Sequence, residues 1–149
     1  MLPQQNQFDI ALDNAEKNYL INNDSLLHYA QKAINIGIPN NYPNTAEAFF
    51  YKSVALFYQA KYNEGLIVTR RGLDWTNKHG LSESIIQGKL YYRLAGNYIM
   101  QGLYEIGLEQ LLVAQDIFEK NNDNNLLFMN MNGIGVVWLK LKEYDKALN

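Results

Sequence analysis

A five-residue phrase, Tyr-x-x-(Gly or Ala)-Leu, occurs three times in this chain. The copies begin at Tyr62, Tyr104 and Tyr144, so their first residues are 42 and then 40 positions apart. A repeat of this length is typical of stacked helix pairs, because one such pair cannot bury its apolar face alone and packs on the next copy. The spacing therefore predicts an all-α superhelical stack of antiparallel helix pairs, an architecture that presents surfaces for recognition.

The composition fits one folded domain over residues 1–149. The chain is 48% hydrophobic, and its three prolines all lie within the first 43 residues. A long stretch without proline favours long helices, because proline breaks a helix interior. The absence of cysteine excludes disulfides, thiolate metal sites and cysteine nucleophiles.

Charge and hydropathy exclude several classes of partner. The 13 basic and 15 acidic side chains are interspersed and the net charge is −2, so we expect no nucleic-acid partner and no attraction to anionic lipid. No apolar run is long enough to span a bilayer, and the start of the chain lacks the hydrophobic region of a signal peptide. We expect a cytoplasmic protein, or a periplasmic one from which a signal sequence has been removed.

About 3.5 repeats are expected, as helix pairs at about 8–37, 44–80, 82–120 and 126–149, with the last pair truncated. Because the third phrase falls just before the end of the chain, we expect a fragment of a longer protein. The single helices are predicted at 8–21, 24–37, 45–60, 63–78, 83–101, 104–120 and 126–141, with a further one starting at Tyr144. The expected start and stop signals are caps at Asp24 and Ser82, a capping box formed by Asn44 and Glu47, and a stop at Gly37 and Pro39.

Glycines recur inside the predicted helices, where each costs about 1 kcal/mol relative to alanine. They are Gly65, Gly72, Gly88, Gly96, Gly107, Gly133 and Gly135. Close approach of neighbouring helices would offset that cost, because a missing side chain leaves room for a large residue of the next helix. We therefore predict tight helix packing at these glycines.

The repeated residues resemble the tetratricopeptide (TPR) motif, which has a small residue and then an aromatic residue in the first helix, an aromatic residue at the turn, and a small residue opening the second helix. The matching residues are Leu94-Ala95, Tyr98, Tyr104 and Gly107-Leu108, and then Ile134-Gly135, Trp138, Tyr144 and Ala147-Leu148. The resemblance is good over 82–149, fair over 44–80 and weak over 8–37. The units are longer than the usual 34 residues and lack the family's proline between repeats, as in the long-repeat type of bacterial signalling proteins.

The resemblance implies a protein- or peptide-binding module. It also implies the N-terminal sensory or regulatory region of a larger bacterial signalling protein, such as a diguanylate cyclase, a histidine kinase or a transcriptional regulator. The alternative is a structural adaptor that assembles proteins and carries no signal. In that case the apolar residues of 126–149 could form a homodimer.

In TPR proteins the first helix of each pair lines a concave groove that holds peptides. By resemblance, the groove residues are Phe50, Val54, Phe57 and Tyr58 in the second pair, Lys89, Tyr92, Arg93 and Gly96 in the third, and Asn132, Val136 and Lys140 in the fourth. Lys89 and Arg93 are four residues apart and share a helix face, so together they could hold a peptide carboxylate. The alternative is that they are solvated charges, paired with Glu47 or Glu83.

No catalytic constellation is present, and we expect neither an enzyme activity nor a cofactor nor a metal site. The two histidines, His28 and His79, have no second ligand or base at a suitable spacing, so we interpret both as structural. Asp123 lies in a run of asparagines, without the alternating acidic ligands of a calcium loop. The expected partner is therefore a protein or a peptide.

Overall fold

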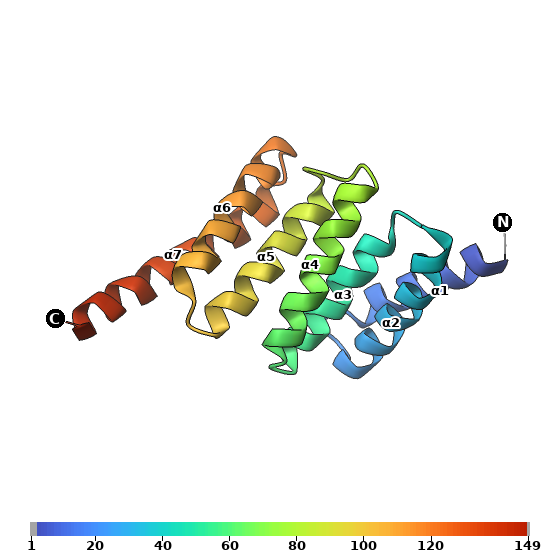
Figure 1. Cartoon of the computed structure of the whole chain (residues 1–149), viewed down its shortest axis with the longest axis horizontal. Helices are drawn as coiled ribbons and strands as arrows, with labels where there is room; N and C mark the ends of the chain where they lie inside the picture. Colours follow the sequence, from blue (N-terminus) through green and yellow to red (C-terminus); the bar gives the residue numbers. More distant parts are fainter. Residues whose placement is uncertain (1–2, 149) are drawn as a thin grey trace.

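The computed structural model describes residues 3–148, which form seven α-helices and no strand. The helices are α1 (Pro3–Asn18), α2 (Asn23–Asn40), α3 (Thr45–Tyr58), α4 (Tyr62–Lys78), α5 (Ile85–Met100), α6 (Tyr104–Lys120) and α7 (Asn124–Leu148). They stack side by side in chain order, from α1 at one end to α6 and α7 at the other (Figure 1). The predicted all-α stack of helix pairs, with an unpaired last helix, is confirmed.

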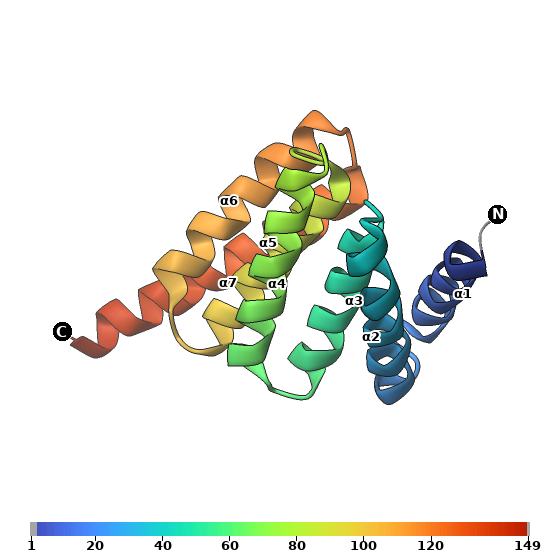
Figure 2. The ribbon, with the colours of Figure 1, turned by 45° about the vertical axis from the view of Figure 1, so that its right-hand side comes forward.

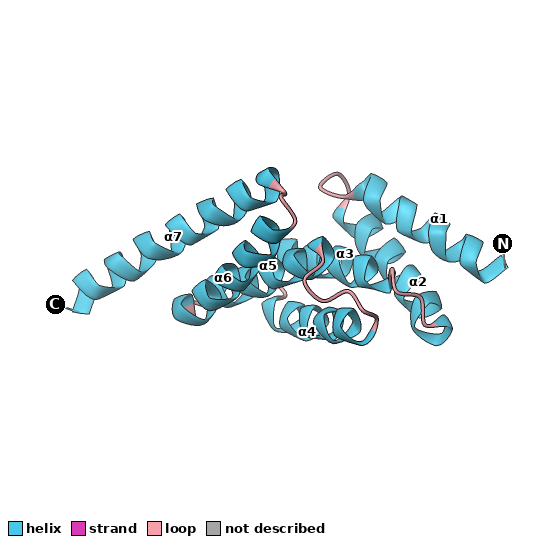
Figure 3. Ribbon diagram, turned by 90° about the horizontal axis from the view of Figure 1, so that it is seen from above, coloured by secondary structure: helices cyan, strands magenta, loops and turns pink. Residues whose placement is uncertain are grey.

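The stack has two layers, which Figure 3 shows from above. One layer holds the second helix of each pair, α2, α4 and α6, and we call its surface the outer face. The other layer holds α1, α3, α5 and α7, with α1 and α7 flanking α3 and α5, and we call its surface the inner face. Successive helices run in opposite directions (Figure 2), and α3 also packs on both α1 and α5.

Large apolar side chains fill the space between the layers. Phe8 of α1, Leu26 of α2, Phe49 of α3, Leu90 of α5 and Phe118 of α6 are each less than 2% exposed. Burying one such side chain contributes about 1.5–3 kcal/mol to stability. The core therefore continues along the stack from one helix pair to the next.

Four of the interior glycines allow the close helix packing that was predicted. A Cβ atom at Gly65, Gly72, Gly88 or Gly107 would lie 2.4–2.9 Å from a side-chain atom of Asn97, Leu90, Phe118 or Ile99, respectively. Gly96 is less tight, because its Cβ would lie 3.3 Å from the Phe57 ring. The prediction is wrong for the α7 glycines: a Cβ at Gly133 would make an ordinary contact at 3.5 Å, and one at Gly135 would meet nothing within 4 Å.

Several predicted helix ends are wrong. α1 begins at Pro3 rather than Phe8, because the missing N–H of proline is no loss in the first turn. α2 continues through Gly37 and Pro39 to Asn40, and Asn41, with φ 57°, ends it by donating its N–H to the carbonyls of Gly37 and Ile38. Proline is tolerated there because the last turn has little helix left to disrupt.

The predicted caps are also displaced. The side chain of Asn22, not Asp24, accepts the N–H of Ser25 at the start of α2. Asn44 makes no side-chain capping bond to α3, because it has helical dihedral angles that turn its side chain away from the first N–H groups. Ser84, rather than Ser82, caps α5 by accepting the N–H of Gln87.

The predicted break after Leu141 does not occur, because α7 continues through the third phrase to Leu148. At the first two phrases the residue two positions before the tyrosine adopts a left-handed conformation, Ala60 with φ 57° and Gly102 with φ 78°. The equivalent Lys142 stays helical. Only four described residues follow Tyr144, too few to bury the apolar surface that would offset a turn. Tyr144 and Trp138 are consequently exposed, at 57% and 59%, rather than packed between helices.

Candidate functional site

Two cations of α5 lie over aromatic rings on the inner face. The Lys89 Nζ is 4.3 Å from the centroid of the Phe50 ring of α3. The Arg93 guanidinium carbon is 4.9 Å from the Phe57 centroid and 5.0 Å from the Tyr92 centroid. The residues meet because spacings of four on α5 and seven on α3 keep each pair on one helix face. Each contact of this kind contributes about 0.5–1 kcal/mol at an exposed site. The rings therefore hold both cations in place.

Carboxylates do not neutralise these cations within residues 3–148, where neither Lys89 nor Arg93 forms an ion pair. Glu83, one expected partner, pairs with Lys120 at 2.5 Å instead. Glu47, the other, lies close enough to Lys89 for their charges to interact without forming a direct ion pair. The Nε of Arg93 is buried and has no hydrogen-bond partner. The two cations are thus available to an incoming carboxylate.

Tyr19, the residue that follows α1, adds a further ring beside Phe50. Its ring centroid lies 6.2 Å from that of Phe50 and 6.0 Å from that of Tyr51. Burial raises the pKa of the Tyr19 hydroxyl, and the nearby charge of Arg93 acts in the opposite direction. No pattern along the sequence indicates this position for Tyr19, because its contacts with α3 depend on how the helices stack.

The inner face also has an acidic side, which the sequence analysis missed. Burial raises the pKa of the Glu47 carboxyl, an effect that Lys89 opposes and Glu16 of α1 strengthens. Burial, followed by the carboxylates of Glu16 and Glu47, raises the pKa of the Tyr51 hydroxyl. Carboxylates from α1 and α3, cations from α5, and tyrosine and phenylalanine rings therefore meet on the inner face. We call Glu16, Glu47, Phe50, Lys89 and Arg93, together with Tyr19, the inner-face cluster.

The other predicted groove residues are placed differently. Phe50 and Val54 are only 5% and 1% exposed, so a ligand would meet the side chains that cover them. Tyr58 is 59% exposed and borders a small hollow lined by Leu20, Ile21 and Asn23. Tyr92 is partly buried in the α5 layer, as are Lys89, Arg93 and Gly96.

The predicted residues of α7 lie apart from the inner-face cluster. Asn132, Val136 and Lys140 are exposed and form a stripe along α7, since they are four residues apart. Lys140 pairs with Glu143 of its own helix at 3.3 Å. The link between α5 and α7 is at Gly133, where a Cβ would lie 3.7 Å from the Tyr92 ring.

The two histidines contact neighbouring side chains: His28 packs edge-on against the Tyr29 ring at 5.0 Å, and the Nε2 of His79 lies 2.7 Å from the Asn41 Oδ1 at the end of α2. His79 hydrogen-bonds through Nδ1 to the Trp75 carbonyl at 2.8 Å and stacks on the Trp75 ring at 4.1 Å. Within residues 3–148 no three His, Cys, Asp or Glu side chains form a group that could hold a metal ion. No helix in the same range is both long enough and apolar enough to cross a membrane.

Comparisons with known proteins identify a fold. No protein-family model matches the chain. It is 31% identical over 103 residues to response regulator aspartate phosphatase I of Bacillus subtilis (strain 168), a match that covers 68% of this chain and 26% of that protein. The chain thus spans about a quarter of the length of this curated relative.

Two solved structures have the same architecture. The apo form of RapI matches with a TM-score of 0.82 at 18% identity, over 96% of this chain and 52% of that one. A Rap protein complexed with Competence and Sporulation Factor matches with a TM-score of 0.81 at 20% identity, over 95% of this chain and 40% of that one. The chain therefore has the TPR-like helical-repeat fold of the Rap proteins, and the TPR resemblance holds at the level of the fold.

Proposed function

We propose that this chain is a protein- or peptide-binding repeat module with a regulatory role in bacterial signalling. The observation that carries the proposal is the inner-face cluster, in which two cations without ion-pair partners among the described residues lie against aromatic rings, near the partly buried carboxylate of Glu47 and the exposed one of Glu16. Such a surface suits a short peptide that carries both signs of charge and one or two apolar residues.

The comparisons support this proposal through the fold. One Rap protein was solved with Competence and Sporulation Factor, and the curated relative is named for a phosphatase that acts on a response regulator. We propose that the chain belongs to a pathway of that type. A cyclase, kinase or DNA-binding output, which the TPR resemblance suggested, has less support because neither the relative nor the structures are named for one.

The proposed binding mode follows from the charges. A carboxylate of the peptide would lie between Lys89 and Arg93, and an apolar side chain would cover the rings of Tyr19 and Tyr92. A peptide cation would lie toward Glu47 and Glu16. A ligand that bridges α1, α3 and α5 favours the stack curvature in which those contacts form together, and this preference would transmit binding to other parts of the protein.

The test measures the affinity of a fluorescein-labelled peptide with an Arg near one end and a free C-terminal carboxylate. We expect the variant Lys89→Gln/Arg93→Gln to bind about tenfold or more weakly, because both charged contacts are lost. The matched control, Lys142→Gln/Lys146→Gln, removes the same charge from exposed positions on α7 and should bind as the parent does. Equal affinities of the inner-face variant and the control would contradict the proposal.

A structural adaptor is the second candidate, and α7 favours it. Phe128, Met131, Trp138 and Leu139 form one apolar stripe at helical spacing, and all four are more than half exposed. Such a stripe can pair with a helix of another protein or with a second copy of α7. Light scattering over a wide concentration range tests the homodimer, and a strict monomer at the highest concentration would count against it.

A further inference from the structure

Two hollows follow one another along the outer face between α2 and α4, and residues of α3 line both. One, of about 560 Å³, lies beside the first half of the two helices, and the other, of about 450 Å³, lies beside the second half. The α3 residues are Phe49, Lys52 and Leu56, whose spacings of three and four place them on one face of the helix. Lys52 in the first hollow is close enough to Arg71 in the second for their charges to interact. We call the two hollows together the outer groove.

The outer groove is basic although the protein as a whole is acidic. Five of the 13 Lys and Arg residues line it, but only two of the 15 Asp and Glu residues do. The basic residues are Lys32, Lys52, Lys61, Arg71 and Lys78, and the acidic residues are Glu64 and Asp74. A chain with a net charge of −2 thus gathers a local excess of positive charge in one elongated depression.

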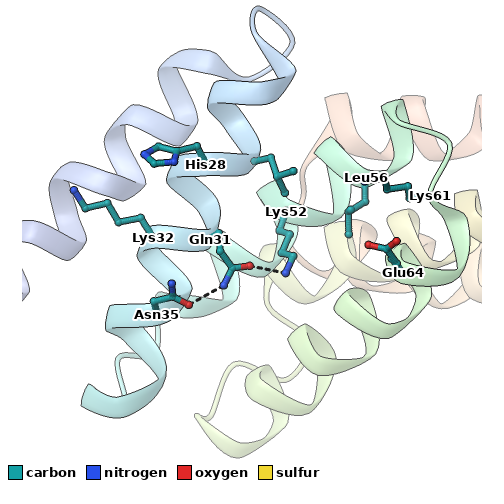
Figure 4. Close-up of a pocket in the computed structure, with 9 residues that line it drawn as sticks. His28, Gln31, Lys32, Asn35, Lys52, Leu56, Lys61 and Glu64 are labelled. Carbon is teal, nitrogen blue, oxygen red and sulfur yellow. Dashed lines mark hydrogen bonds between the residues drawn. The ribbon is translucent and has the colours of Figure 1, made fainter.

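Among the residues that the structure describes, Lys52 forms no direct ion pair, although the charge of Glu64 acts on it from a distance. Its Nζ donates to the Gln31 Oε1 at 2.5 Å, and the Gln31 Nε2 donates to the Asn35 Oδ1 at 2.7 Å, so that a chain of amides aligns the ammonium group (Figure 4). Within residues 3–148 no carboxylate pairs with any Lys or Arg of the outer groove. Burial, followed by the charge of Arg71, lowers the pKa of the Lys52 amine. An anion in the groove would offset the repulsion between Lys52 and Arg71.

The shape of the groove decides the class of anion. Lys32 and Lys52 extend in different directions (Figure 4), so the cations form a strip and do not converge on a single phosphate-sized point. α2 and α4 have 18 and 17 residues, a length of about 25 Å. An elongated, multivalent partner fits this strip better than a small anion does.

Nucleic acid fits the outer groove poorly. The Trp75 ring is stacked on His79 at 4.1 Å and Phe49 is only 1% exposed, so these two rings offer no row of open platforms on which successive bases could stack. Glu64 and Asp74 would repel a continuous phosphate backbone, whereas a polypeptide can place a neutral or basic residue opposite each of them. We propose that the outer groove is a second binding site, separate from the inner face, for an acidic segment of a partner protein.

The test uses the full chain and a short fluorescein-labelled peptide of alternating Glu and Leu. We expect binding at about 50 mM salt that weakens at about 300 mM, because screening shortens the range of the charges. A control peptide of alternating Lys and Leu, which has the opposite charge, should not bind. The variant Lys52→Gln/Arg71→Gln should lower the affinity about tenfold, and the matched control Lys142→Gln/Lys146→Gln should change it less than about twofold. If the first variant does not fold, Lys32→Gln/Lys78→Gln removes two exposed charges from the same groove.

Three results would overturn the proposal. If the groove variant and the α7 control lost affinity for the peptide equally, the net charge of the protein, and not the groove, would attract the peptide. If oligothymidylate displaced the labelled peptide at a lower concentration than the unlabelled peptide does, the site would be assigned to nucleic acid. The same result with inorganic phosphate would assign it to a small anion. If only Lys89→Gln/Arg93→Gln lowered the affinity, the peptide would bind to the inner face. That result would refute the outer site and leave the proposed function intact.

Discussion

Replacing one of two helical glycines by alanine should have opposite effects on stability, depending on which glycine is changed. A Cβ at Gly88 of α5 would lie 2.6 Å from the Phe118 Cε1 and 2.9 Å from the Ile117 Cγ2. Phe118 is fully buried, so its ring cannot swing aside. A Cβ at Gly135 of α7 would meet nothing within 4 Å. The two variants therefore share the gain in helix propensity and differ in overpacking.

The size of the difference follows from two known costs. Alanine is favoured over glycine in a helix interior by about 0.5–1 kcal/mol, so Gly135→Ala should raise the free energy of unfolding by that amount. Overpacking a full core costs about 1–3 kcal/mol, so Gly88→Ala should be roughly 1–3 kcal/mol less stable than Gly135→Ala. Since about 1 kcal/mol changes the melting temperature by about 2–4 °C in a protein of this size, the two variants should melt several degrees apart.

Urea unfolding followed by circular dichroism measures both free energies on the same scale. The parent protein and Gly96→Ala, whose Cβ would lie 3.3 Å from the Phe57 ring, provide the reference and an intermediate case. If Gly88→Ala stabilised the protein as much as Gly135→Ala, within about 0.5 kcal/mol, the close approach of α5 and α6 would be refuted as the reason for a glycine at position 88.

Three further substitutions test other contacts. Because burial raises the pKa of Glu47, its ionisation costs the folded state free energy. Glu47→Gln should therefore raise the melting temperature at pH 7, with a gain that shrinks as the pH falls toward the ordinary Glu pKa of 4.5, and a pH-independent gain would refute this origin. Trp75→Phe removes the hydrogen bond from Nε1 to the Tyr42 carbonyl, 3.1 Å long, and should cost about 1 kcal/mol in urea unfolding. Asn130 is fully buried and donates to the Leu111 carbonyl at 2.8 Å. Asn130→Asp should therefore lower the free energy of unfolding by more than about 2 kcal/mol at pH 7. Part of that stability should return at about pH 4, when the new carboxyl is protonated.

The stacked helices were predictable because their signals are local. The phrases at Tyr62 and Tyr104 mark real turns, since Ala60 and Gly102 reverse the chain just before them. The third phrase has the same letters but lies inside α7. A turn there requires a following helix to stack on, and no local pattern reports whether that helix is present. The end of α2 was missed for a related reason, since packing of Gly37 against Thr45 and Phe8 keeps the helix intact up to Pro39.

The candidate site was predictable only in part. Lys89 and Arg93 were correctly placed on one helix face, because spacing along one helix determines that. Their partners could not be predicted, since the contacts with Phe50 and Phe57 depend on the register of α5 against α3. The outer groove was missed entirely, because Lys52 and Arg71 belong to different helices and form no pattern in the sequence.

The stacking of each helix on its neighbours also bears on folding kinetics. In the part of the chain that the structure describes, most contacts between helices join those that follow one another in sequence. The main contacts between helices that are not consecutive join α1 to α3 and α3 to α5. Such a topology has a low contact order, so little loop-closure entropy is lost before native contacts form, and folding within about milliseconds is expected. Nucleation can begin at any helix pair and extend in either direction. Local opening near α1 can therefore occur while α5 and α6 stay protected from hydrogen exchange.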